Sequence, residues 1–162
     1  MKNLLIVSLL ITLLAACSNN QEELQTAALT DEAELSSLVF GKYYGFCLGD
    51  CATLYKVEAN TLLIDEINRF MDWESLRFQT KPLSGDRYAV AKTLLNEFPE
   101  ELLQERQETI GCPNCADQGA FAIEVQQNGE TRRWIIDTDR NVLPDYLKAY
   151  VDKIDTVMNQ LQ

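Results

Sequence analysis

The dipeptide Asn128-Gly129 stands between two stretches of alternating apolar and polar residues, and it constrains the fold more than any other feature of the sequence. Asn-Gly readily adopts the left-handed backbone conformations that a two-residue hairpin turn requires. Counting outward from the turn pairs Glu124 with Arg133 on one face and Ile123 with Trp134 on the other. An acid faces a base and two apolar side chains lie together, so the register is self-consistent. The sequence therefore predicts an antiparallel hairpin.

Three further segments show the period of two that is typical of strands. Residues 38–46 carry apolar or aromatic side chains at even positions, namely Leu38, Phe40, Tyr44 and Phe46. A second hairpin is predicted around Ala59-Asn60, with one apolar sheet face formed by Tyr55, Val57, Leu62 and Ile64. Residues 73–78 are interpreted as one more strand, with Leu76 and Phe78 facing inward.

Two longer segments have the apolar spacing of amphipathic helices. One is predicted to begin at Ser84-Gly85-Asp86 and to end before Pro99, with a further short turn over residues 100–105. The other follows Pro144 and carries a stripe formed by Tyr146, Leu147, Tyr150, Val151, Ile154, Val157, Met158 and Leu161. Strands and helices do not alternate regularly. We therefore expect an α+β fold, in which a small antiparallel sheet of about five or six strands carries two main helices on one face.

The N-terminus has the layout of an export signal. Lys2 precedes a largely apolar run over residues 4–16, which is too short to span a bilayer as a helix. The run ends in Leu14-Ala15-Ala16-Cys17, which resembles the lipobox of bacterial lipoproteins. The resemblance implies cleavage before Cys17 and diacylation of its thiol; an ordinary secretory signal with a chance cysteine is the alternative. With the lipidated cysteine, the mature chain is anchored to a membrane through its N-terminal lipid.

This assignment divides the chain into three regions. They are a lipoprotein signal peptide over residues 1–16, a lipid-anchored acidic tether over residues 17–37 and a single α+β globular domain over residues 38–162. Ser18, rather than Asp, follows the cysteine, and by resemblance to other outer-membrane lipoproteins this implies release from the inner membrane. We expect a protein anchored in the outer membrane by its lipid, facing either the periplasm or the cell surface.

The residue counts exclude several functional classes. The sequence holds no histidine, which removes every mechanism that needs imidazole as a base, a proton shuttle or a metal ligand. Its 25 acidic residues outnumber the 14 basic ones, for a net charge of −11. Such a charge repels the phosphate backbone of nucleic acids. Nucleic acid is therefore not expected as a partner.

The remaining four cysteines form two tight pairs along the sequence, Cys47 with Cys51 and Cys112 with Cys115. Four cysteines allow three pairings, and the sequence does not choose between local rings and long cross-links. Export into an oxidising compartment favours structural disulfides, with no cofactor. The spacing also fits a four-thiolate zinc site, which is one alternative.

A thiol-disulfide oxidoreductase is the other alternative, because Cys-Pro-x-Cys occurs in such enzymes. Here the motif is followed by Ala116 and a predicted strand, whereas a redox-active pair normally opens a helix whose dipole lowers the pKa of the attacking thiol. The nearest charged residues in sequence are Glu108 and Asp117, and both disfavour a thiolate. The local sequence therefore does not support a reactive cysteine.

Two motifs together resemble a group of uncharacterised bacterial lipoproteins. The early motif is Gly45-Phe46-Cys47-Leu48-Gly49-Asp50-Cys51, which follows the pattern Gly-x-Cys-x-Gly-x-Cys. The late motif is Gly111-Cys112-Pro113-Asn114-Cys115-Ala116-Asp117, where the family pattern is Gly-Cys-Pro-Asp-Cys-Ala-Asp and this chain has Asn114 in place of Asp. The resemblance covers roughly residues 40–134. It implies that the two cysteine motifs belong to one site, and it implies no activity.

Asp50 and Asp117 each lie beside a cysteine motif, so they form a carboxylate pair or a calcium site if the motifs meet; ordinary loop solvation is the alternative. The sequence contains no glycine-rich phosphate-binding loop, no nucleophile elbow and no long basic run. We therefore favour a lipid-anchored envelope protein that acts as a non-enzymatic binding or structural module stabilised by its paired cysteines, with a protein partner that the sequence does not identify. An envelope thiol-redox or four-cysteine zinc protein is the alternative.

The lipobox yields a direct prediction. Cys17→Ser removes the acylated thiol, so the variant should stay unprocessed or be released as a soluble protein. Intact-mass analysis of membrane-extracted protein measures the N-terminal modification. An unacylated N-terminus at another residue in the unmodified protein would show that the lipobox assignment is wrong.

Overall fold

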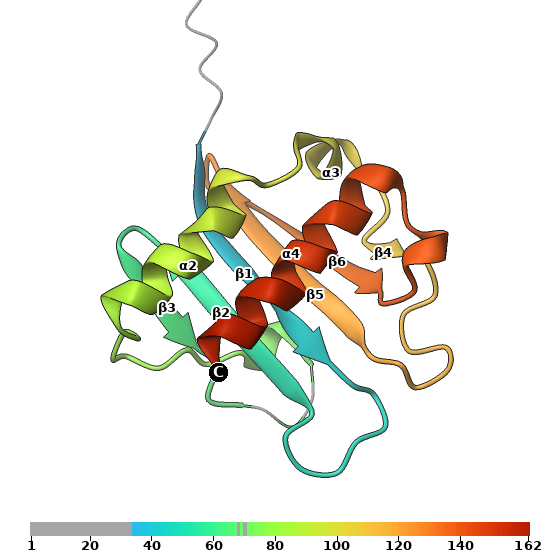
Figure 1. Cartoon of the computed structure of the whole chain (residues 1–162), viewed down its shortest axis with the longest axis horizontal. Coiled ribbons are helices and arrows are strands. Elements are labelled where there is room, and N and C mark those ends of the chain that lie inside the picture. The colour runs from blue at the N-terminus through green and yellow to red at the C-terminus, as the bar shows by residue number, and fades with distance from the viewer. Residues whose placement is uncertain (1–33, 68, 70) are drawn as a thin grey trace, which may run out of the picture. The chain divides into compact units, whose positions relative to one another are not determined.

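The structure is a computed structural model that describes residues 34–67, 69 and 71–162 (Figure 1). The predicted signal peptide, Cys17 and nearly all of the predicted tether lie outside this range. The described chain forms one sheet in the order β3-β2-β1-β5-β6-β4. The strands are β1 (Leu35–Tyr43), β2 (Ala52–Glu58), β3 (Thr61–Ile64), β4 (Thr109–Ile110), β5 (Ala120–Gln127) and β6 (Glu130–Asp137).

Helices cover one face of this sheet (Figure 1). They are α2 (Gly85–Asn96), α3 (Glu100–Gln104) and α4 (Asp145–Leu161), with 3-10 turns η1 (Trp73–Ser75) and η2 (Arg140–Val142) in the connections. Strand pairs are antiparallel except β4 with β6, which run parallel. The expected α+β fold is confirmed. Within the described residues, no helix has the length and apolar character needed to cross a bilayer.

Both predicted hairpins form in the predicted register. Asn128 and Gly129 have φ values of 53° and 81°, which is the left-handed backbone that a two-residue turn needs. Glu124 opposes Arg133 across β5 and β6, and the Arg133 guanidinium Nε lies 2.6 Å from the Glu124 carboxylate. In the other hairpin, β2 pairs with β3 so that Tyr55 lies opposite Ile64 and Val57 opposite Leu62.

β1 is the central strand and is buried on both faces. Leu38 and Phe40 face the helices, and Val39 between them faces the opposite side of the sheet. The helix-side core takes in residues from β1, β2, β5, β6, α2 and α4. From α4 it includes Leu147, Tyr150, Val151, Ile154, Val157, Met158 and Leu161, so the predicted stripe on that helix is buried almost as a whole.

The predicted strand over residues 73–78 is wrong. Trp73 begins the turn η1, and Phe78 makes only an isolated bridge with Asp65. The apolar residues of this connection pack on the second face of the sheet, against a small cluster formed by Val39, Leu54 and Ala122. A loop that lies on a sheet also points alternate side chains toward it, which explains why the segment has a strand-like period.

The first strand is shifted from its predicted span of residues 38–46. β1 starts at Leu35 and ends at Tyr43, so Tyr44 and Phe46 lie beyond it. The backbone N–H of Tyr44 donates to the carbonyl of Cys51, 2.8 Å away, and this bond closes the loop between β1 and β2. The alternating aromatic pattern therefore continues past the end of the sheet into an exposed loop.

The buried stripe of α4 predicts a large loss of stability on truncation. Ile154→Ala removes a fully buried side chain and should lower the free energy of unfolding by about 2–5 kcal/mol. Gln160→Ala on the exposed side of the same helix should change it by less than about 0.5 kcal/mol. Denaturant melts of the two variants measure the difference. Equal effects would show that the stripe is not part of the core.

Candidate functional site

The four cysteines of the domain pair locally. Cys47 is bonded to Cys51 and Cys112 to Cys115, with a Cα–Cα distance of 5.5 Å in each pair. Because the sequence separations are only four and three residues, each disulfide closes a small ring. In the chain-entropy treatment such rings stabilise a fold by about 2 kcal/mol each, against about 4 kcal/mol for the long cross-link that the sequence also allowed.

Both rings lie at the same end of the sheet. The first is in the loop between β1 and β2, and the second is in the loop between β4 and β5. Since β1 ends where antiparallel β5 begins, the two loops are neighbours. We call residues 44–51 and 111–119 together the cysteine end. The structure therefore brings together the two motifs that the family resemblance assigns to one site.

Asn114 connects the two loops. Its side-chain oxygen accepts a hydrogen bond from the backbone N–H of Gly45, 3.3 Å away. Burial raises the pKa of the Tyr43 hydroxyl, and a side-chain hydrogen bond with the same Asn114 lowers it in part. The ring of Tyr44 lies over Gly119, where an added Cβ would stand 2.7 Å from a ring carbon. The two loops thus contact each other through the side chains of Asn114 and Tyr44 rather than through a disulfide.

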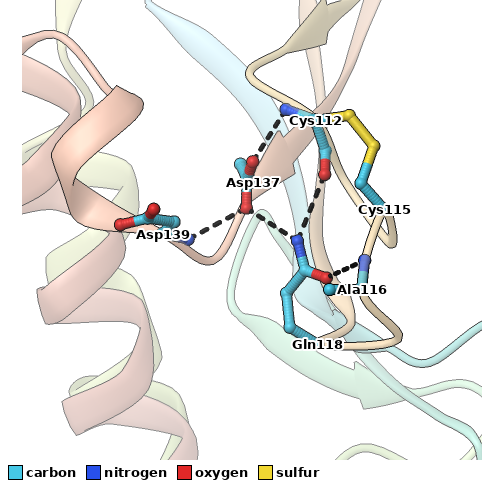
Figure 2. Close-up of a disulfide and its surroundings, with 6 residues drawn as sticks. All are labelled: Cys112, Cys115, Ala116, Gln118, Asp137 and Asp139. Atoms are coloured by element: carbon cyan, nitrogen blue, oxygen red, sulfur yellow. Dashed lines mark hydrogen bonds between the residues drawn. A yellow bond between two sulfur atoms is a disulfide. The ribbon is translucent and has the colours of Figure 1, made fainter.

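The carboxylate of Asp137 holds the second loop in place (Figure 2). It accepts hydrogen bonds from the backbone N–H of Cys112 at 2.7 Å, from the side-chain amide of Gln118 at 3.1 Å and from the backbone N–H of Asp139 at 2.9 Å. Gln118 also donates to the carbonyl of Cys112 and accepts from the N–H of Ala116. This side chain therefore spans the ring that the Cys112–Cys115 disulfide closes.

Asp137 is 3% exposed, and it is ionised at neutral pH. Burial raises the pKa of its carboxyl group, but the hydrogen bonds donated by Asp139, Cys112, Gln118 and the Thr138 backbone together lower it by more. Its pKa is consequently below the ordinary value. A fixed negative charge bonded to the amide of Cys112 disfavours a thiolate at that residue.

The second loop needs residues that tolerate a left-handed backbone. Gly111 has a φ of 79°, and a Cβ there would stand 2.6 Å from the Cβ of Asp137. Asn114 and Asp117 have φ values of 59° and 56°, which Asn and Asp adopt more readily than other side chains do. The glycine at position 111 is therefore required by the close approach of Asp137.

Exposed apolar residues gather at the cysteine end. Among the described residues, the large hydrophobic side chains that are exposed are Tyr44 (43%), Phe46 (86%), Leu48 (103%) and Val142 (53%). The first three belong to the β1–β2 loop. Val142 lies against Gly111, with a methyl group 3.1 Å from the position of a Cβ on that residue. Cys51 by contrast is 2% exposed, so it ties the exposed loop to the core.

The cations beside the cysteine end are bound by α4. The Lys42 ammonium lies 2.5 Å from the carboxylate of Asp155, and the Arg140 guanidinium lies 2.7 Å from the same carboxylate and 2.9 Å from Asp152. Both cations also lie over the ring of Phe121, at 4.6 and 5.0 Å from its centroid. The cluster joins the C-terminal half of α4 to the sheet.

Two shallow clefts accompany these elements. One, of about 200 Å³, lies beside Cys51 and is bordered by Lys42 and Asp155. The other, of about 350 Å³, lies along the edge of β6 between residues 105–108 and 131–134. In the second cleft the Arg132 guanidinium donates hydrogen bonds to the carbonyls of Leu103 and Glu105, so the role of this side chain is structural.

The candidate metal sites stay predictions. Within residues 34–67, 69 and 71–162, no group of three or more His, Cys, Asp or Glu side chains is placed to hold a metal ion. Asp50 and Asp117 lie in different loops of the cysteine end, and both are exposed. The four cysteines that a zinc site would use are bonded in pairs.

The structure gives a role to three residues to which sequence reasoning assigned none, namely Asp137, Gln118 and Asn114. Asp137 is the strongest case, since it carries the hydrogen bonds of a whole loop. The sequence feature that could have revealed Asp137 is its position directly after the apolar pair Ile135-Ile136 of a predicted strand. An acid at the buried end of a strand must be hydrogen-bonded or paired.

The chain matches no protein-family model, and no curated protein is similar to it in sequence.

The role of Asp137 predicts a pH-dependent loss of stability. Asp137→Asn keeps the shape of the side chain but cannot accept all three hydrogen bonds, so it should lower the free energy of unfolding by about 1–3 kcal/mol at neutral pH. Because the folded-state pKa lies below the ordinary 3.8, the ionised carboxylate stabilises the fold above that pH. This stabilisation is lost as the pH falls through the lowered pKa.

Thermal or denaturant melts from pH 7 down to about pH 3 test this prediction. The gap between the original protein and Asp137→Asn should be constant near neutral pH and shrink below about pH 4. Glu130→Gln, at an exposed carboxyl group, is the control and should show no such gap. A gap that does not change with pH would show that the charge of Asp137 is unimportant.

Proposed function

We propose that this protein is a lipid-anchored bacterial envelope protein that works as a non-enzymatic binding module, with the cysteine end as its contact surface. The observation that carries the proposal is the gathering of Tyr44, Phe46, Leu48 and Val142 at one end of the domain, as the exposed large hydrophobic residues of the described chain. Large apolar side chains that are exposed together at one end of a domain are typical of an interaction site.

The small rings support a binding role. The disulfide between Cys47 and Cys51 stabilises the fold by about 2 kcal/mol in the chain-entropy treatment, about half as much as a long cross-link would. It also restricts the shape of the loop that carries Phe46 and Leu48. Restricting a contact loop in advance reduces the entropy lost on binding.

The cysteine end and the first residue of β1, Leu35, lie at opposite ends of that strand. The chain that leads from Cys17 enters the domain at Leu35, at the start of β1, and the cysteine end begins where β1 finishes at Tyr43. Nine residues of strand, at about 3.3 Å each, separate these points by roughly 30 Å.

A thiol-redox or zinc protein is the competing proposal. The observation in its favour is that Cys112 and Cys115 are both exposed. The negative charge of Asp137 at the amide of Cys112 opposes it, because an attacking or metal-binding sulfur must be a thiolate. A zinc site requires metal-bound thiolates, and a redox role requires a Cys112–Cys115 disulfide that thiols reduce readily. The binding module instead requires disulfides that stay unreactive.

Photocrosslinking in the cells that produce the protein tests the binding role. A photoreactive amino acid at Leu48 should yield an adduct of one defined mass, and Phe46→Ser in the same chain should weaken it. The same amino acid at Asn60, an exposed turn at the other end of β2, should yield no such adduct. Absence of an adduct at Leu48, or an equal adduct at Asn60, would contradict the proposal.

A further inference from the structure

One edge of the sheet is left partly open, and this edge indicates a second contact of the domain. We infer that the outer edge of β6 at residues 131–133 binds an extended peptide segment of another protein, which adds to the sheet as one more strand. This edge lies toward the 128–129 turn, at the end of the sheet opposite the cysteine end. The inference is therefore independent of the proposed contact surface.

Alternate residues of β6 direct their backbone groups away from β5. The N–H of Ile135 donates to the carbonyl of Glu108, 2.7 Å away, so Ile135 faces outward. Because this direction alternates along a strand, the N–H and C=O groups of Thr131 and Arg133 face outward too. β4 pairs with β6 only at residues 135 and 136. Within the described chain, no hydrogen bond reaches the outward backbone groups of Thr131 and Arg133.

The chain that runs past this edge does not pair with it. Residues 105–108 form the far wall of the cleft of about 350 Å³ beside β6, and their backbone groups bond elsewhere. The Arg132 guanidinium donates to the carbonyl of Glu105. The Glu105 carboxylate accepts from the N–H groups of Arg106 and Gln107, at 2.9 and 3.3 Å. The wall is thereby held across from β6 while the strand edge stays open.

The other edge of the sheet is covered by the chain itself. The carbonyls of Leu62 and Ile64 in β3 accept hydrogen bonds from the N–H groups of Leu83 and Gln79, at 2.8 and 2.9 Å. Open strand edges are templates for pairing with another chain, and proteins usually cover or blunt them. The open stretch of β6 is therefore the place where the described sheet can accept a further strand.

The unpaired groups indicate an extended backbone as the occupant. A strand at the usual spacing of about 4.8 Å from β6 can pair with the N–H and C=O groups of both Thr131 and Arg133. The cleft, at about 350 Å³, is near the lower end of the range for ligand pockets. Its far wall also stands where the body of a second sheet would have to lie. The cleft therefore fits a single peptide segment better than a second copy of this chain.

The side chains around the cleft give little preference for a charged peptide. Two guanidinium groups and two carboxylates of its lining offset each other. The third guanidinium, that of Arg133, is bound to the carboxylates of Glu124 and Glu74, at 2.6 and 3.1 Å. We therefore expect recognition through the peptide backbone, with broad tolerance of peptide sequence.

Thr131 allows this edge to be blocked without changing the pairing of β5 with β6. Thr131→Pro removes an outward N–H, and proline is tolerated on an edge strand where its nitrogen faces away from the sheet. Thr131→Val is the matched control, because it keeps the N–H and suits a strand. The Thr131 side chain is exposed, so neither change removes core packing. Thermal melts check that both variants fold.

A phage-displayed random heptapeptide library supplies the probe. Depletion on the full-length Thr131→Pro protein in detergent, followed by selection on Thr131→Val, removes peptides that bind elsewhere, including those that bind the cysteine end. The most enriched peptide is then synthesised unmodified and in two N-methylated forms, one at odd and one at even positions. Each form lacks the N–H donors on one side of an extended peptide.

The unmodified peptide should bind the original protein and Thr131→Val equally. It should bind Thr131→Pro about tenfold more weakly, as expected for the loss of one hydrogen bond. One N-methylated form should lose binding and the other should keep it, because only one side of a strand faces β6. The bound peptide should also slow hydrogen exchange at the backbone amides of Thr131 and Arg133.

Three outcomes would overturn the inference. They are a selection that yields no peptide able to distinguish Thr131→Val from Thr131→Pro, equal binding of both N-methylated forms, and unchanged exchange at the two amides. Sedimentation velocity examines the other occupant. A dimer of the original chain that Thr131→Pro converts to a monomer would assign this edge to a second copy and would equally refute a peptide partner.

Discussion

The cysteine end depends on the hydrogen bonds that the buried carboxylate of Asp137 accepts. Asp137 is the last residue of β6. Its carboxylate accepts hydrogen bonds from the backbone N–H groups of Cys112 and Asp139 and from the side-chain amide of Gln118. Ionised and nearly inaccessible, it costs free energy unless every donor stays in place. The loop after β4 is therefore held to the sheet by hydrogen bonds, and its disulfide only restricts a ring that is already anchored.

The hydrogen bonds that hold the second loop also explain how apolar side chains of the first loop stay exposed. Asn114 projects from the fixed second loop to bond the backbone of Gly45 in the first. Between them, the Asn114 contact and the buried sulfur of Cys51 hold a loop whose Phe46 and Leu48 make little contact with the domain. Left unrestrained, exposed apolar side chains tend to collapse onto the nearest apolar surface. The rings and hydrogen bonds thus keep these apolar side chains exposed to water, as the proposed contact surface requires, at a cost in solvation free energy.

Local rules predicted the framework of the fold but not the site. The Asn128-Gly129 turn specified the register of β5 and β6, and helical spacing specified α4, because both patterns arise from neighbours in sequence. Burial of Val39 depends on the connection between β3 and α2 lying on the second sheet face, and the alternation in that connection imitates a strand. The bonds of Asp137 to Cys112 and Gln118 join segments that are distant in sequence, which no local pattern encodes. The cysteines pair locally, but the sequence allowed three pairings and did not choose among them.

The central claim is that the cysteine end is a rigid, oxidised contact surface built from two local rings. Mass spectrometry of a non-reduced proteolytic digest, made from protein extracted from membranes with its thiols blocked, tests this claim most directly. The account predicts one intact ring between Cys47 and Cys51, another between Cys112 and Cys115, and no blocked thiol at any of the four. A fragment that links the two loops, or blocked thiols at Cys112 and Cys115, would contradict it.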